Sequence, residues 1–172
     1  MTTRLLLVRH GAVSYSGRVG GADDGLNTLG ELQTQALARR LVERNIAAVY
    51  TSPLARAAQT GAVLGQFLGA PVREDARLRE GDPGESREAF RDRVLVAAEE
   101  IVFSHPGHEA VAVSHSDALS ALIGHYLGLA IRIGSGWPFA LDYCAISVLE
   151  FDGESVAVRA LNDCAHLEGL AL

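Results

Sequence analysis

The chain has 172 residues, of which 48% are hydrophobic and 21% are charged, a balance that excludes a disordered or fibrous protein. Its formal net charge of −6, without any run of basic residues, disfavours nucleic-acid binding. An anionic ligand would have to be held by a few inward-pointing cations and backbone N–H groups, because the overall field repels it. The sequence predicts a single domain over residues 1–172 and leaves the oligomeric state open.

The N-terminal segment and the cysteines indicate the cellular context. The apolar run from Leu5 to Val8 stands between two arginines and is too short for a signal peptide or a membrane span. Cys144 and Cys164 lie in neither CxxC nor CxxH spacing, so the sequence predicts no zinc or redox chemistry. We expect a cytoplasmic protein with no membrane partner.

The expected elements alternate between strands and helices. Leu5 to Val8 predicts a buried strand, residues 12–25 a long loop, and Thr28 with Glu31 a capping box that begins a helix reaching about residue 44, with Leu32 on its buried face. The remaining elements are expected to be a strand at 47–51, a helix capped by Ser52 and closed by Gly69, a strand at 72–73, a helix capped by Ser86 and reaching 103, a strand at 110–114, a helix capped by Asp117 and reaching 127, and a hairpin of 145–151 with 155–160. This order predicts an α/β fold, a three-layer α/β/α sandwich with a mixed, mostly parallel sheet.

Three polar segments follow buried strands of this predicted sheet. They are Arg9-His10-Gly11, the Ser52 to Arg56 segment and Ser114-His115. Parallel strands place their carboxyl ends on one edge of the sheet, so two histidines and two arginines should meet there. Arginine holds phosphoryl oxygens through its planar fork of donors, and a neutral imidazole attacks phosphorus through a nitrogen lone pair. The constellation predicts covalent phosphoryl transfer without a metal.

The same residues give the chain a close resemblance to the histidine phosphatase superfamily, also called the phosphoglycerate mutase-like family. The resemblance implies that His10 becomes phosphorylated, that Arg9, Arg56 and His115 clamp the transferring group, and that no cofactor is needed. It also implies that Glu80 protonates the leaving oxygen and then activates water. The matching segments are LLLVRHGAV at 5–13, LNTLGELQTQALARRL at 26–41, VYTSPLARAAQT at 49–60, LRE at 78–80, GESREAFRDRV at 84–94, VAVSHSDAL at 111–119 and LNDCAHL at 161–167.

The sequence departs from the family pattern in several places. Only residues 81–83 separate Glu80 from the GES motif, so we expect the site to be open on that side, and Asp82 and Glu85 compete for the role of acid. Ser16 stands where mutase-type members often carry Asn. Ser116-Asp117 replaces the commoner Gly-Gly, so a close mutase relative is disfavoured.

The favoured function is hydrolysis of a small phosphorylated metabolite through a phosphohistidine at His10. A protein phosphohistidine phosphatase, a mutase-like phosphotransferase and a non-catalytic phosphate-binding module are the alternatives. Arg18 and Ser16, in the loop after the nucleophile, are candidate contacts to the rest of the substrate. We expect Trp137 and Phe139 to cover the core, and the C-terminal LNDCAHL segment to be structural.

Overall fold

A computed structural model describes residues 1–14, 24–130, 136–153 and 155–170 of the chain. The strands are β1 (Thr3–Arg9), β2 (Ile46–Thr51), β3 (Val72–Glu74), β4 (Glu109–Ser114), β5 (Ile146–Asp152) and β6 (Ser155–Asp163). The helices are α1 (Thr28–Leu41), α2 (Ala55–Leu68), α3 (Arg87–Ser104) and α4 (Ser116–Tyr126), with short 3₁₀ helices at Ala76–Leu78 and Ala165–Leu167. Among these helices none is long and apolar enough to cross a membrane.

The strands form one six-stranded sheet in the order β3-β2-β4-β1-β5-β6. The pairs β2–β3, β2–β4 and β1–β4 are parallel, and β5 is antiparallel to both of its neighbours. In the register of the two central strands Val8 lies opposite Val113 and Arg9 opposite Ser114. The residues that follow β1 and β4 therefore emerge side by side at one edge of the sheet.

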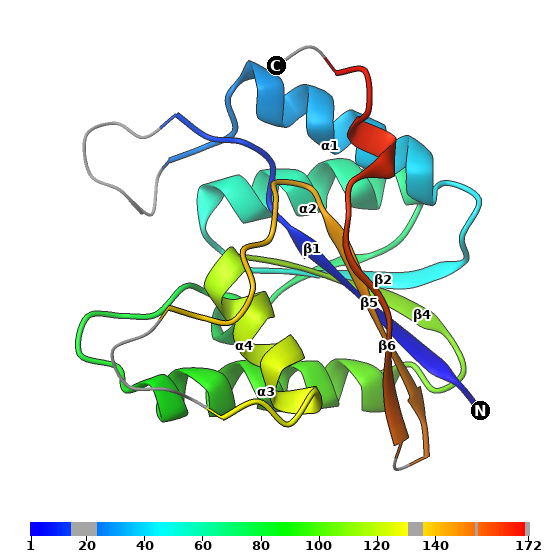
Figure 1. Cartoon of the computed structure of the whole chain (residues 1–172). Coiled ribbons are helices and arrows are strands. Elements are labelled where there is room, and N and C mark those ends of the chain that lie inside the picture. The colour runs from blue at the N-terminus through cyan, green and yellow to red at the C-terminus, as the bar shows by residue number, and fades with distance from the viewer. Residues whose placement is uncertain (15–23, 131–135, 154, 171–172) are drawn as a thin grey trace.

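Helices cover both faces of the sheet, with α1 and α2 on one side and α3 and α4 on the other (Figure 1). Successive side chains of β1 alternate between the two layers, since Leu6 and Val8 pack toward α1 and α2 whereas Leu5 and Leu7 pack toward α3 and α4. A strand buried on both faces needs the continuous apolar run that the sequence shows. The predicted three-layer sandwich with a mixed, mostly parallel sheet is confirmed.

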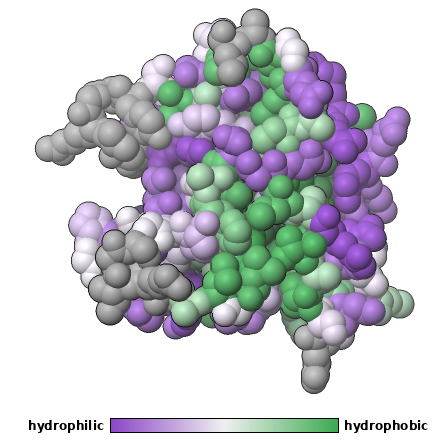
Figure 2. Space-filling view, viewed as in Figure 1, coloured by the Kyte–Doolittle hydropathy of each residue, from purple (hydrophilic) through white to green (hydrophobic). Residues whose placement is uncertain are grey.

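The surface outside these layers keeps some apolar side chains. Figure 2 shows them gathered over α4 and the neighbouring β5–β6 part of the sheet. Trp137 and Phe139 pack against the core cluster on the α3–α4 side, as the sequence predicts. Leu127 and Leu161 remain nearly half exposed at 47% and 43%.

The starts of three predicted helices needed correction, namely those of α1, α2 and α4. The cap of α1 is Asn27 rather than Thr28, since the Asn27 side chain accepts a hydrogen bond from Gly30 N at 2.8 Å. Leu32 on this helix is 45% exposed. Gln33 and Thr34 face the sheet in its place. The Gln33 side chain accepts from Ala12 N in the loop after β1, and the Thr34 hydroxyl donates to Gly30 O of the same helix.

Two further predicted caps serve other purposes. Helix α2 begins only at Ala55, and the Ser52 hydroxyl lies against a histidine instead of capping the helix. Helix α4 begins at Ser116, so Asp117 lies in its first turn. There the positive end of the helix dipole interacts favourably with a carboxylate. Ser86 does cap α3 by accepting from Ala89 N at 3.1 Å, and Gly69 ends α2 with a left-handed φ of 62°, both as predicted.

Candidate active site

The two histidines predicted for the site meet at the ends of β1 and β4. His10 directly follows β1, and His115 directly follows β4. Their ring centroids lie 5.1 Å apart, and the two residues are only 2% and 0% exposed. A backbone hydrogen bond from His10 N to Ser114 O, 3.0 Å long, holds the two strand ends together. The pairing of the central strands thus creates the histidine pair.

The surroundings of His10 leave one ring nitrogen with a free lone pair. Its Nδ1 lies 2.8 Å from the carbonyl oxygen of Gly11, which can only accept, so Nδ1–H is the donor and Nε2 keeps its lone pair. Burial lowers the pKa of His10 to about 3, and the charges of Arg9 and Arg56 add to this effect against the opposing Gly11 hydrogen bond. The imidazole is therefore neutral and nucleophilic at physiological pH.

A close approach between the loop after β1 and the start of α1 fixes this histidine. A Cβ on Gly11 would lie 2.7 Å from Gly30 O, and a Cβ on Gly30 would lie 2.1 Å from Ala12 O. Neither position can accept a side chain without moving backbone. Ala12 N donates to the side-chain oxygen of Gln33 at 2.9 Å, and Gly11 N donates to the hydroxyl of Thr60 at 3.2 Å. The sequence signalled Gly11 but not these partners.

The two predicted arginines flank the histidines. Arg56 is 1% exposed, and its Nη2 lies 2.5 Å from a carboxylate oxygen of Glu80. Arg9 donates from Nη1 to the carbonyl of Leu141 at 2.5 Å, and its guanidinium carbon stacks 3.8 Å from the ring centroid of Tyr143. The buried Nε of Arg9 has no hydrogen-bond partner among the described residues. Two fixed guanidinium groups beside a neutral histidine form a site suited to a phosphoryl dianion.

His115 is held between two different groups. Its Nε2 lies 2.9 Å from the Ser52 hydroxyl, and its Nδ1 lies 3.8 Å from Oε1 of Glu80. Within the described part of the chain this buried Nδ1 makes no hydrogen bond. Burial first, and then the nearby His10 and arginine charges, lower the pKa of His115 to about 2. A buried ring nitrogen without a hydrogen-bond partner among the described residues, close to two arginine charges, is a candidate contact for a bound anion.

The three candidate acids differ in their surroundings. Glu80 faces Arg56 and His115, and its side chain is 40% exposed, so solvent reaches it. Asp82 pairs with Arg79 at 2.7 Å on the surface. Glu85 is held by Arg93 through two bonds of 2.7 Å, an arrangement that secures the turn before α3. Only Glu80 of the three contacts the histidine and arginine cluster among the interactions described.

Sequence reasoning missed Tyr143, which contacts both Arg9 and His10. Its ring centroid lies 5.5 Å from that of His10. The following residue, Cys144, has a φ of 56°, and its backbone N donates to Arg9 O at 3.0 Å. The carbonyl of Cys144 lies 3.1 Å from Nε2 of His166, so the C-terminal tail supports this turn. A tyrosine in a segment without periodicity carries no sequence signal of this contact.

Other predictions fall outside this cluster. Ser16 and Arg18 lie in the range 15–23, outside the described residues. In the described ranges no group of three or more His, Cys, Asp or Glu side chains is placed to hold a metal ion.

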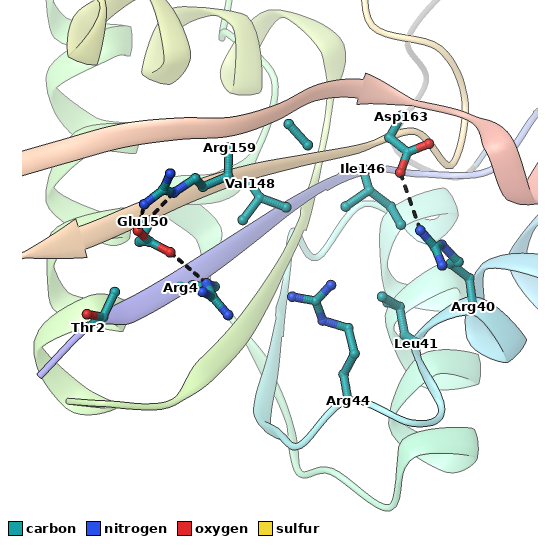
Figure 3. A pocket seen from close by; sticks show the side chains of 11 residues that line it. Thr2, Arg4, Arg40, Leu41, Arg44, Ile146, Val148, Glu150, Arg159 and Asp163 are labelled. Atoms are coloured by element: carbon teal, nitrogen blue, oxygen red, sulfur yellow. Dashed lines mark hydrogen bonds and ion pairs between the residues drawn. The ribbon is translucent and has the colours of Figure 1, made fainter.

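A separate cleft of about 600 Å³ lies between the end of α1 and strands β1, β5 and β6 (Figure 3). Its charged lining residues are Arg4, Arg40, Arg44, Arg159, Glu150 and Asp163. Every one of these arginines forms an ion pair with a neighbouring carboxylate, and Glu150 pairs with two of them. This network stabilises the sheet edge and does not include the paired histidines.

The chain belongs to the histidine phosphatase superfamily (branch 1), whose sequence model matches residues 5–85 and 81–164. It is a phosphatase of this type.

Among its relatives is the putative phosphoserine phosphatase 2 of Hydrogenobacter thermophilus, 26% identical over 97% of this chain and 98% of the relative. The probable phosphoglycerate mutase GpmB of Escherichia coli is 27% identical over 98% of this chain and 97% of its own. The bifunctional protein Rv2228c of Mycobacterium tuberculosis is 32% identical over 96% of this chain, which spans only 55% of that protein. A mycobacterial glucosyl-3-phosphoglycerate phosphatase, Rv2419c, solved in complex with VO3, aligns with a TM-score of 0.80 at 26% identity, over 92% of this chain and 98% of its own.

Proposed function

We propose that the chain hydrolyses a small-molecule phosphomonoester through a covalent phosphohistidine on His10. The observation that carries this proposal is the state of His10, a buried and neutral imidazole whose Nδ1–H is committed to Gly11 O at 2.8 Å. Nε2 is then the free nucleophile, and the positive charges of Arg9 and Arg56 act on the same ring. No metal is required, because these cations neutralise the phosphoryl oxygens.

The residues divide the reaction into two balanced steps. In the first, Nε2 of His10 attacks phosphorus, the ester P–O bond breaks, and the leaving oxygen takes a proton from the carboxyl group of Glu80. In the second, water attacks the phosphohistidine, gives its proton to the Glu80 carboxylate, and the P–N bond breaks to restore neutral His10. Arg9, Arg56 and His115 hold the nonbridging oxygens in both steps. Glu80 is assigned the proton transfers because it alone of the three acids faces this cluster among the described contacts.

Hydrolysis is favoured over return of phosphate to a second hydroxyl group. The side chain of Glu80 is 40% exposed, so water reaches the group that has to activate it. A mutase would need to exclude water from its phosphohistidine. The phosphatase relatives are named for phosphoserine and glucosyl-3-phosphoglycerate, both small phosphorylated metabolites, which supports a substrate of this size. A phosphohistidine protein is the competing substrate that the following experiment separates.

The test is phosphate release from an aryl phosphate by the wild type, His10→Ala and, as a matched control, His108→Ala. His108 is an exposed histidine in the turn before β4, so its loss should leave turnover unchanged. We expect His10→Ala to be inactive and EDTA to have no effect. A rapid alkaline quench with labelled substrate should trap acid-labile phosphate on the wild type only. Release by His10→Ala at the wild-type rate would refute the proposal.

The substrate class is tested on the same proteins. A panel of phosphorylated metabolites, including phosphoserine and sugar phosphates, is compared with a phosphohistidine protein by kcat/KM. We expect the highest value for a small metabolite. A higher value for the protein substrate would reassign the chain to protein phosphohistidine hydrolysis while leaving the role of His10 intact.

A further inference from the structure

The Ser52 hydroxyl and Glu80 lie near different ring nitrogens of His115. Ser52 and His115 are both 0% exposed, and Ser52 Oγ lies 2.9 Å from Nε2. The other ring nitrogen, Nδ1, lies 3.8 Å from Glu80, which also bonds Arg56. The ring therefore presents Nδ1 to the cluster of charges and Nε2 to the serine.

Strand register makes this contact. Thr51 pairs with Val113 in the β2–β4 ladder, and Ser52 N donates to Val113 O at 3.0 Å. Ser52 thus extends the pairing of β2 with β4 by one residue, beside the end of β4 that His115 follows. The sequence places Ser52 at a helix N-cap, but helix α2 begins three residues later, at Ala55. The hydroxyl is consequently available to the histidine.

The other hydrogen bond of the Ser52 hydroxyl shows whether this hydroxyl donates to His115 or accepts from it. Ser52 Oγ accepts from Leu54 N at 3.3 Å, so one lone pair is in use. A buried hydroxyl also needs an acceptor for its proton, and within the described part of the chain the contact that supplies one is Nε2 of His115. When the hydroxyl donates to Nε2, the neutral imidazole must carry its own proton on Nδ1.

We propose that Ser52 is a positioning residue, which holds neutral His115 in the Nδ1–H tautomer so that this ring donates a hydrogen bond to the transferring phosphoryl group. The inference rests on the proposed function. It explains why the buried Nδ1 has no hydrogen-bond partner among the described residues, since the phosphoryl oxygen would be its acceptor.

The tautomer matters because His115 enters the reaction uncharged. Burial and the adjacent cations lower its pKa to about 2, so its protonation does not supply a second N–H at physiological pH. A neutral imidazole presents a donor at one nitrogen and a lone pair at the other. If Nδ1 carried the lone pair, it would repel the phosphoryl oxygens instead of binding them.

The direct test is the tautomer itself, read from long-range ¹H–¹⁵N NMR correlations of the ¹⁵N-histidine-labelled protein at neutral pH. The His115 signals are assigned by their loss in His115→Gln. We expect protonated Nδ1 and unprotonated Nε2 in the wild type. A wild-type spectrum with the proton on Nε2 overturns the inference, whether or not the protein hydrolyses aryl phosphates.

Variants at Ser52 connect the tautomer to turnover. We expect Ser52→Ala to shift His115 toward the Nε2–H tautomer and to lower kcat for an aryl phosphate by about tenfold or more, as loss of an oriented donor does. Ser52→Thr keeps the hydroxyl and should restore the wild-type tautomer signature. Ser120→Ala is the matched control, because it removes another fully buried serine hydroxyl, one that accepts from Phe139 N at 2.9 Å. An unchanged tautomer and kcat in folded Ser52→Ala would refute the inference without touching the role of His10.

Discussion

The histidine pair should make the fold sensitive to mild acid. In the native state burial lowers the pKa of His10 to about 3 and that of His115 to about 2, from an ordinary value of 6.5. At pH values between the native pKa values and 6.5, the unfolded chain binds protons on these two histidines that the native chain does not bind. The free energy of unfolding therefore falls as the pH falls below 6.5. Lowering the pH from about 7.5 to about 5 should reduce the free energy of unfolding by about 2 kcal/mol for each histidine, or about 4 kcal/mol for the pair.

Removing one titrating ring isolates this effect. Chemical denaturation of the wild type and His10→Ala at the two pH values gives two differences in the free energy of unfolding. We expect the pH-dependent loss to be smaller by about 2 kcal/mol in His10→Ala, because one depressed pKa is gone. Both measurements stay above the range in which most carboxylates titrate. Vanadate or inorganic phosphate should reduce the loss in the wild type, since an anion beside the rings favours their protonation.

A control separates titration from packing. Val8→Ala removes methyl groups from a fully buried residue of β1, the strand that His10 follows, and should destabilise the protein equally at both pH values. Its pH-dependent loss should therefore match that of the wild type. The reasoning would be refuted if His10→Ala and the wild type lost the same stability between the two pH values.

Three other substitutions test the surroundings of the site. Glu80→Gln should slow turnover of a substrate with a poor leaving group at least about tenfold, whereas Glu85→Gln should instead lower the melting temperature by loosening the Arg93 contact; equal rates in both would exclude Glu80 as the acid. Gly30→Ala should destabilise the protein by about 1–3 kcal/mol in denaturant titrations and reduce kcat, while Gly136→Ala, whose Cβ would meet nothing within 4 Å, should do neither. Tyr143→Leu should raise KM severalfold by releasing the stacked guanidinium, and Tyr143→Phe should not; similar KM values in the two variants would contradict a stacking role.

Most of the fold follows from signals that are local in sequence. The apolar runs at the centre of β1 and β4 predict doubly buried strands, and a strand of this kind has few alternatives in an α/β domain. Gly69 and Ser86 end and begin helices through their own backbone and side chain, so their roles can be read without knowing the tertiary structure. The order of strands and helices then predicts the sandwich.

The predictions for α1 were wrong where two neighbouring residues could take the same position, as the helix cap or on the buried face. Asn27 and Thr28 are both good caps, and the choice depends on which side chain reaches Gly30 N. Gln33 lies on the inner face of α1 because the loop after β1 needs an acceptor for Ala12 N, a requirement that is visible only in three dimensions. Helical periodicity alone gave that face to Leu32.

The candidate site was predictable to the extent that it consists of residues at strand ends. Arg9 ends β1, and His10 and His115 directly follow β1 and β4, so strand pairing alone brings them together. Tyr143 could not be found in this way, because it lies in an irregular segment more than a hundred residues beyond β1 and reaches His10 through the backbone of the next residue. The structure places Glu80 beside Arg56, although neither distance nor orientation could be inferred from its shortened loop.

In the proposed mechanism one arrangement supplies both the charge that binds phosphate and the nucleophile. Arg9 and Arg56 supply the positive charge that a phosphoryl group needs, and the same charges oppose protonation of His10 and His115. An exposed imidazole would be partly protonated near neutral pH and would lose its nucleophilic lone pair. Burial beside two cations keeps it neutral, and the incoming dianion then offsets the repulsion. The predicted acid sensitivity of the unliganded protein is thus the stability cost of holding the proposed nucleophile uncharged beside two cations.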